Sequence, residues 1–138
     1  MAPRETLLPR ISDAEWVVMK VLWARPPSTA KEIIAALPAE TRWNPKTVLT
    51  LINRLVDKGA LGFEKEARTH RYFPKVTERE CVRVESRSFL DRVYGGAIQP
   101  MLAHFVEETP MSETDITELR KILDEKRPAG PKHGKAKP

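Results

Sequence analysis

The chain has 138 residues, of which 41% are hydrophobic and 31% charged, and its formal net charge is +5. This length allows one domain or two small units, and the composition predicts a soluble globular chain. No stretch approaches the roughly 18 apolar residues of a membrane helix, and the N-terminal segment lacks the apolar core of a signal peptide. The single cysteine, Cys81, excludes an intramolecular disulfide framework and favours a cytoplasmic setting.

The charges are unevenly distributed along the chain. Residues 1–76 carry 13 Lys and Arg against 8 Asp and Glu, whereas residues 77–126 carry 7 against 11. Residues 127–138 carry 4 against none. A basic front half indicates a polyanionic partner such as DNA, although such a small excess also occurs in proteins that bind no polyanion.

The first helix is expected over residues 13–24. Residues 1–11 are expected to be flexible because two prolines interrupt them. Ser12 then serves as N-cap, and Glu15 three residues later completes a capping box. The residues expected to be buried by this helix are Trp16, Met19, Leu22 and Trp23.

A second helix is expected at about 29–37, with Ser28 as its N-cap and Pro38 as its stop. Apolar residues recur along it with the spacing of one helix face. These residues are Ala30, Ile33, Ile34 and Leu37.

Residues 44–58 have the clearest two-faced pattern in the chain. Asn44 suits the N-cap, Pro45 the first helical position, and Gly59 the left-handed residue after the helix. The apolar face consists of Val48, Leu51, Ile52, Leu55 and Val56, and the polar face of Lys46, Thr47, Thr50, Asn53, Arg54 and Asp57. A short helix, a turn and such a longer helix predict a helix-turn-helix in which residues 44–58 read DNA. An ordinary solvated amphipathic helix is the alternative interpretation.

A β-hairpin is expected next, with strands at 61–66 and 70–74 and a loop at 67–69. Three helices followed by a basic hairpin predict a winged helix. The basic residues expected to lie along DNA phosphates are Lys65, Arg68 and Arg71.

Individual roles follow from side-chain chemistry. Lys46 is expected to bind a phosphate at the start of the helix, and Thr47 and Thr50 a phosphate or a thymine methyl group. Arg54 is expected to reach a phosphate or a guanine edge, or else to be solvated or paired with Asp57. Trp43 is expected to pack on the sugar–phosphate backbone, or else to close the corner between the second and third helices.

Three more helices are expected at 78–94, 97–108 and 113–126. They expose apolar faces but form a unit of only about 50 residues, which usually needs a partner to bury them. We therefore expect homodimerisation, with packing back onto the winged domain as the alternative. The dimer residues are predicted to be Phe89, Val93, Ile98, Met101, Leu102, Phe105, Val106, Ile116, Leu119 and Leu123.

The predicted fold class is mainly α with a small β-hairpin: a winged helix-turn-helix domain followed by a three-helix dimerisation module. The expected segments are a flexible N-terminus at 1–11, a DNA-binding domain at 12–76, a dimerisation domain at 77–126 and a disordered basic tail at 127–138. The tail composition, rich in proline, glycine and lysine, is typical of disorder.

Several segments resemble the BlaI/MecI-type repressors of bacterial penicillinase and methicillin-resistance genes. The resemblance covers about residues 10–126. It is carried by Ala14-Glu15-Trp16 within 11–19, Pro45-Lys46-Thr47-Val48 within 44–55, Lys58-Gly59, Phe89-Leu90, Val93-Tyr94-Gly95-Gly96, Glu118-Leu119-Arg120 and Ile122-Leu123.

The resemblance implies a homodimeric winged-helix repressor that binds a palindromic operator in double-stranded DNA. In that family, a membrane-bound zinc metalloprotease sensor relieves repression by cleaving between Asn and Phe in the dimerisation domain. The corresponding pair here is His104-Phe105, in which His replaces Asn. A related copper-responsive branch has paired cysteines near its C-terminus, and this chain has only Cys81.

No enzyme or cofactor motif is recognisable. His70, His104 and His133 have no metal-ligand spacing with one another or with Cys81, so no metal site and no cofactor are expected. Phosphate-binding glycine loops and hydrolase motifs are absent from the sequence. Cys81 is expected to be a small packed residue, with a redox sensor as the alternative. The competing function is a winged-helix module that binds a protein instead of DNA.

Overall fold

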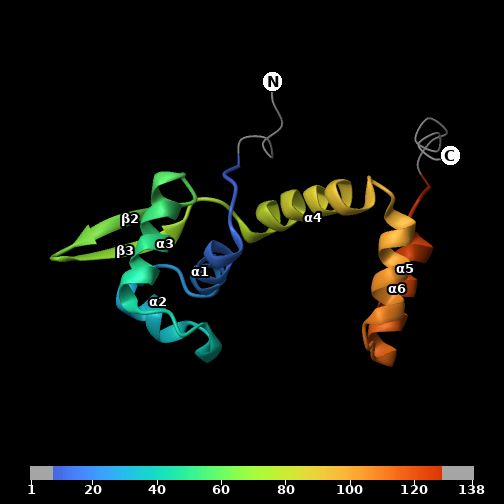
Figure 1. The fold of residues 1–138 in the computed structure, drawn as a ribbon, viewed down its shortest axis with the longest axis horizontal. Helices are drawn as coiled ribbons and strands as arrows, with labels where there is room; N and C mark the ends of the chain where they lie inside the picture. Colours follow the sequence, from blue (N-terminus) through green and yellow to red (C-terminus); the bar gives the residue numbers. More distant parts are fainter. Residues whose placement is uncertain (1–7, 129–138) are drawn as a thin grey trace, which may run out of the picture. The chain divides into compact units, whose positions relative to one another are not determined.

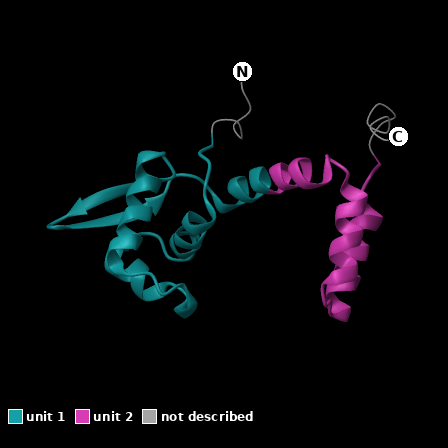
Figure 2. Cartoon of the chain, viewed as in Figure 1, with its two compact units in different colours: residues 1–85 teal, residues 86–138 magenta. Residues whose placement is uncertain are grey.

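The computed structural model describes residues 8–128 and divides the chain into two compact units, residues 1–85 and 86–138 (Figures 1 and 2). The first unit is a winged helix-turn-helix with a small antiparallel sheet, and helices follow it, so the predicted fold class is confirmed. Most of the expected flexible N-terminus and of the expected basic tail lies outside the described residues.

Helix α1, Asp13–Ala24, begins at the predicted capping box. The Ser12 hydroxyl accepts the Glu15 N–H at 3.2 Å, and the Glu15 carboxylate accepts the Ser12 N–H at 2.9 Å. Met19 and Leu22 are fully buried, as predicted. The two tryptophans, Trp16 and Trp23, are only half-buried and pack edge to face with their ring centroids 5.5 Å apart.

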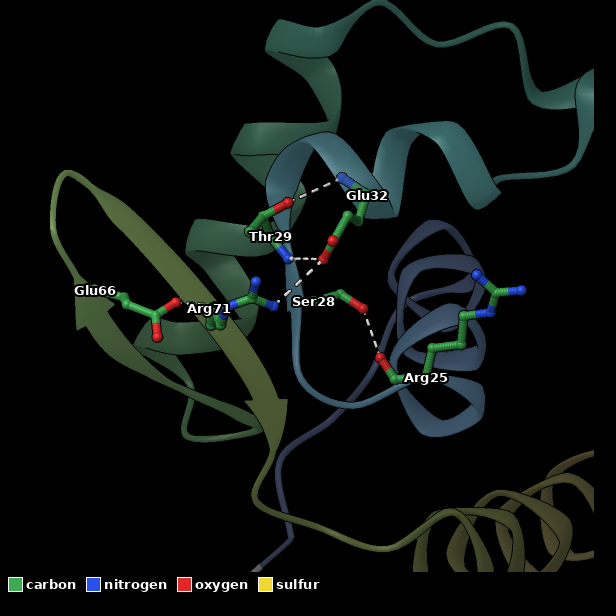
Figure 3. Close-up of polar contacts among 6 residues, drawn as sticks. All are labelled: Arg25, Ser28, Thr29, Glu32, Glu66 and Arg71. Atoms are coloured by element: carbon green, nitrogen blue, oxygen red, sulfur yellow. Dashed lines mark hydrogen bonds and ion pairs between the residues drawn. The ribbon is translucent and has the colours of Figure 1, made fainter.

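Helix α2, Ala30–Ala36, has Thr29 as its N-cap, so the predicted cap at Ser28 was wrong. The Thr29 hydroxyl accepts the Glu32 N–H, and the Glu32 carboxylate accepts the Thr29 N–H. Ser28 could not form such a reciprocal pair because its third following residue is Lys31. Its buried hydroxyl instead donates to the Arg25 carbonyl at 2.5 Å (Figure 3).

The predicted hairpin is part of a three-stranded antiparallel sheet. Strand β2, Leu61–Glu66, pairs with β3, Thr69–Pro74, and the two-residue strand β1, Ser28–Thr29, pairs with the other edge of β3. The resulting order is β1-β3-β2. A two-residue strand is too short to produce an alternating pattern, which explains why the sequence did not reveal β1.

Helix α3, Pro45–Asp57, follows a short 3₁₀ turn, η2, Ala39–Thr41. Its predicted ends are confirmed: the Asn44 side chain accepts the Thr47 N–H at 2.9 Å, and Gly59 has a φ of +87°. The predicted apolar face is also confirmed, since Val48, Leu51, Ile52 and Leu55 are buried and Val56 is half-buried.

The core of the first unit reaches into helix α4, Glu78–Tyr94. Val76 and Cys81 are buried in the same cluster as Met19, Ile33 and Ile52. The Trp23 indole N–H also donates to the Val76 carbonyl at 2.9 Å. These contacts explain why the unit boundary lies inside α4, at 85/86, rather than at 76/77 where the sequence placed it.

The second unit contains the end of α4, helix α5, Ile98–Glu108, and helix α6, Glu113–Glu125. Gly95 and Gly96 end α4 with positive φ angles of 60° and 83°. The Phe89 and Phe105 rings stack with centroids 6.1 Å apart. Neither α5 nor α6 buries a residue, and the exposed large apolar side chains of this unit include Val93, Ile98, Leu102, Phe105, Val106, Ile116, Leu119, Ile122 and Leu123.

Candidate nucleic-acid interface

The polar face of α3 is the main surface that could contact DNA. Packing of Leu51, Ile52 and Leu55 into the core fixes the rotation of the helix about its axis. The opposite side is therefore open to solvent, and its exposed residues are Lys46, Thr47, Thr50, Asn53, Arg54 and Asp57. The side chains of this face include an ammonium group, a guanidinium group, two hydroxyls and an amide, which suit phosphates and base edges.

The start of α3 is ordered by its own hydrogen bonds. Asn44 occupies the Thr47 N–H, and the Thr50 hydroxyl donates to the Lys46 carbonyl at 3.1 Å. In this arrangement Thr50 retains its methyl group and oxygen lone pairs for other contacts. That combination fits a thymine methyl group or a base amino group better than a phosphate, which needs a donor.

Arg54 lies at the edge of a shallow depression formed with Ser12, Glu15, Asp57 and Lys58. Within the part of the chain that the structure describes, its guanidinium forms no ion pair or hydrogen bond, and this includes the pair with Asp57 considered from the sequence. The five donors of the guanidinium thus remain available for an anion or a guanine edge.

Trp43 is half-buried and packs against the core of the first unit. This position matches the second of the two predicted placements, in which its ring closes the corner between α2 and α3. A role on the sugar–phosphate backbone stays a prediction.

The wing, residues 61–74, presents fewer free cations than the sequence predicted. Lys65 and Arg68 are exposed. Arg71 instead binds carboxylates, with Nε 2.8 Å from Glu66 and Nη1 3.7 Å from Glu32 (Figure 3). Its predicted contact with phosphates is disfavoured by this pairing, because both neighbouring carboxylates would repel the phosphate.

The Arg71 network also includes backbone groups at the start of α2. The Thr29 N–H and then the Arg71 charge hold the pKa of Glu32 below its ordinary value. The hydrogen bond to Glu66, followed by the charge of Glu32, raises the pKa of Arg71. The network thereby links α2 to both long strands of the wing, and no local sequence pattern predicts this connection because Glu32 is far from Glu66 and Arg71 in the chain.

An aromatic cluster covers one face of the wing. His70 stacks on Phe63 with ring centroids 4.5 Å apart and an interplanar angle of 22°. The ring centroids of Tyr72 and Phe63 are 6.0 Å apart. Phe63 is opposite Tyr72, and Lys65 is opposite His70, in the strand register. From the sequence, His70 and Tyr72 are expected on one face of their strand because they are two residues apart, whereas the contact with Phe63 depends on the register between the strands.

A buried ion pair ties the end of α3 to the start of α1. Lys58 Nζ lies 2.7 Å from the Glu15 carboxylate, whose side chain is 3% exposed, and it also donates to the Arg10 carbonyl. Burial alone would raise the pKa of Glu15, but the hydrogen bonds from Lys58 and Ser12 and the Lys58 charge outweigh it, so the pKa is lowered. The sequence predicts Glu15 only as a capping residue, because Lys58 is distant along the chain.

No metal site is evident in the described range, since residues 8–128 contain no group of three or more His, Cys, Asp or Glu arranged to hold an ion.

Burial, followed by the charges of Glu80 and Glu78, raises the pKa of the Cys81 thiol. A protonated, buried thiol is a poor nucleophile, which fits a packing role. No helix among the described residues is long and apolar enough to span a membrane.

Comparison with known proteins gives a consistent result. A family model described as Penicillinase repressor matches residues 11–125. The penicillinase repressor of Bacillus licheniformis is 42% identical over 118 residues, covering 86% of this chain and 92% of that protein. The methicillin resistance regulatory protein MecI of Staphylococcus aureus strain N315 is 36% identical over 116 residues, covering 84% and 94%.

A solved structure, the DNA-binding domain of the repressor BlaI in solution, shares 42% sequence identity with the chain. It covers 53% of this chain and 89% of its own, with a TM-score of 0.48. Because the family model spans most of the chain and a relative of similar length is 42% identical, the chain belongs to the penicillinase repressor family, a family of transcriptional repressors and not of enzymes.

Proposed function

We propose that the protein is a homodimeric, cytoplasmic repressor that binds a palindromic operator through α3 and the wing. The observation that carries this proposal is the exposed polar face of α3, held in place by the buried face opposite. Membership of a repressor family supports it. In this arrangement α3 enters the major groove, and Lys65 and Arg68 of the wing lie near the backbone.

Dimerisation is assigned to the second unit. Its exposed apolar residues include Leu102 and Phe105 on α5 and Leu119 and Ile122 on α6, with exposures between 41% and 61%. Such side chains in a small unit favour a second copy of the same unit as their cover.

The mechanism of repression is steric. Two copies of α3 read half-sites separated by about one helical turn of DNA, roughly 34–36 Å, or a small multiple. A dimer bound in this way occupies the promoter and excludes polymerase. Occupancy depends on both units, because each winged unit alone binds weakly and the dimer gains through effective concentration.

Relief of repression is assigned to proteolysis by a membrane-bound zinc metalloprotease sensor. The proposed bond joins His104 and Phe105, both exposed on α5. Because Phe105 also belongs to the predicted dimer surface, cleavage there would weaken the dimer without altering α3. Mass spectrometry of the chain after coexpression with a neighbouring protease gene tests this assignment; intact chain would exclude cleavage by that protease.

A gel shift with the promoter of its own operon tests the whole proposal. We expect a specific complex whose affinity falls steeply as the salt concentration rises, because bound phosphates release counterions. The alternative function, a winged-helix module that binds a protein, predicts no complex with DNA at any salt concentration and a stoichiometric complex with another protein.

Replacing Arg54 with alanine is expected to weaken operator binding by about 1–3 kcal/mol, because the guanidinium is unpaired and lies at the edge of the α3 face. Fluorescence anisotropy with labelled operator measures the effect. Arg120→Ala on α6 is the matched control, since it removes the same charge from the second unit. Equal affinities for Arg54→Ala and wild type would remove Arg54 from the interface.

A further inference from the structure

A shallow depression lies between the start of α2 and the tip of the wing. None of its lining residues belongs to α3. Residues from β1 and the first turn of α2 form one wall, and the wing turn and β3 form the other. The lining residues are Thr29, Ala30, Lys31, Arg68, Thr69, His70 and Tyr72.

The charged groups that line this depression are cationic. Lys31 and Arg68 carry positive charge, both are exposed, and neither forms an ion pair within the described part of the chain. No Asp or Glu belongs to the lining. The Thr29 hydroxyl accepts the Glu32 N–H, which leaves its own proton free to be donated. Two free cations and a hydroxyl donor on opposite walls match the oxygens of a phosphate.

The surrounding contacts hold the two walls together and limit the opposing negative charge. Arg71 joins Glu32 on α2 to Glu66 on the wing, and its guanidinium neutralises one of these two negative charges (Figure 3). On the wing side, stacking on Phe63 holds the half-buried His70 ring in place. The walls are thus supported from both sides, whereas Lys31 and Arg68 themselves have no protein partner in the described range.

We propose that this depression binds a phosphate of the duplex DNA backbone, with Lys31 and Arg68 as its cationic ligands. The inference rests on the DNA binding proposed above and adds a second contact separate from the face of α3. A phosphate held between α2 and the wing carries no sequence information, but it fixes the position of α3 in the groove. Its loss should weaken binding to every duplex sequence to a similar extent.

The test uses the full chain and two labelled duplexes, one carrying the promoter of its own operon and one of random sequence. Affinity is measured by anisotropy at several salt concentrations between about 50 and 200 mM. Lys31→Gln and Arg68→Gln are each expected to reduce the slope of log affinity against log salt by about one, with similar losses on both duplexes.

Lys20→Gln is the matched control. Lys20 is an exposed lysine of α1 that pairs with Glu78, so this change removes the same charge from the same unit but outside the depression. We expect its salt slope to equal that of wild type. Circular dichroism tests whether each variant is folded, and we expect all three to fold because the replaced side chains are exposed.

The outcomes separate the two proposals. Wild-type slopes for both Lys31→Gln and Arg68→Gln, in a chain that binds DNA, would overturn the phosphate site and leave the repressor function intact. Failure of the wild-type chain to bind either duplex would overturn the repressor function. Loss of binding to the promoter duplex alone would also contradict the site, since a phosphate contact must affect both sequences.

Discussion

A chain that ends at Glu85 is expected to bind operator DNA about 10²–10⁴-fold more weakly than the full chain, because it keeps the DNA face but loses the link between two copies. Gel shifts with a two-half-site duplex measure this loss. On a duplex with a single half-site, both chains should bind with similar affinity. Equal affinity on the two-half-site duplex would contradict a mechanism that depends on the dimer.

The position of the truncation matters. Cutting at Val76, where the sequence placed the domain boundary, would remove Cys81 from the core of the first unit. It would also remove Glu78, which pairs with Lys20 of α1. Weak binding by that shorter fragment would not distinguish loss of the dimer from loss of stability. A chain that ends at Glu85 retains both contacts.

Point variants of the full chain provide a matched comparison. Leu119→Asp introduces a charge at an exposed apolar position of α6, and Thr117→Asp introduces the same charge at a polar position of the same helix. We expect only Leu119→Asp to lower the sedimentation coefficient towards the monomer and to weaken binding to the two-half-site duplex. A monomeric wild-type chain at the concentrations that bind DNA would remove the basis of this prediction.

Replacing Lys58 with methionine is expected to lower the free energy of unfolding by about 3 kcal/mol, because it leaves the Glu15 carboxylate buried without its cation. This loss of free energy is at the lower end of the range for breaking a buried ion pair, because the Lys58 side chain is 32% exposed. Urea unfolding monitored by tryptophan fluorescence measures the change. A loss below about 0.5 kcal/mol would show that water or another group replaces the ammonium.

Two further variants make the Lys58 experiment specific. Lys20→Met breaks the exposed ion pair with Glu78 and is expected to cost less than about 1 kcal/mol. Adding Glu15→Gln to Lys58→Met removes the unpaired charge, and we expect it to recover part of the lost stability. No recovery would locate the loss in the hydrocarbon packing of Lys58 rather than in its charge.

The same ion pair predicts how stability depends on pH. The folded chain holds the pKa of Glu15 below its ordinary value of 4.5, so the unfolded chain binds the proton more tightly. The stability contributed by this carboxylate is therefore fully present above pH 4.5 and is lost as the pH falls through the lower, folded pKa. Urea unfolding at a series of acidic pH values should show a smaller pH dependence in Glu15→Gln than in wild type.

Local signals in the sequence were sufficient for the helices of the first unit. Asn44, Pro45 and Gly59 mark the ends of α3, and Val48, Leu51 and Ile52 mark its buried face. These signals act within one or two helical turns, so they can be read without knowledge of distant residues. The predicted N-cap of α2 failed by one residue because Ser28 and Thr29 are both good caps, and the position of Glu32 decides between them.

Contacts between distant residues were beyond reach from the sequence. Strand β1 exists because β3, more than 40 residues later, offers it a hydrogen-bonding edge. Arg71 was assigned to DNA because a basic residue in a hairpin favours that role, whereas tertiary packing brings Glu32 of α2 to its guanidinium. Lys58 and Glu15 become a buried pair for the same reason.

The sequence by itself determined the two-faced helix at 44–58, the winged helix-turn-helix order and the family to which the chain belongs, because periodicity, caps and family-specific segments are local properties. Only the tertiary structure decided which cations are free. Arg54, Lys31 and Arg68 have no acidic partner among the described residues, whereas Arg71 and Lys58 are held by carboxylates. A charge read from sequence is available to DNA only if folding brings no opposite charge to within a few ångströms of it.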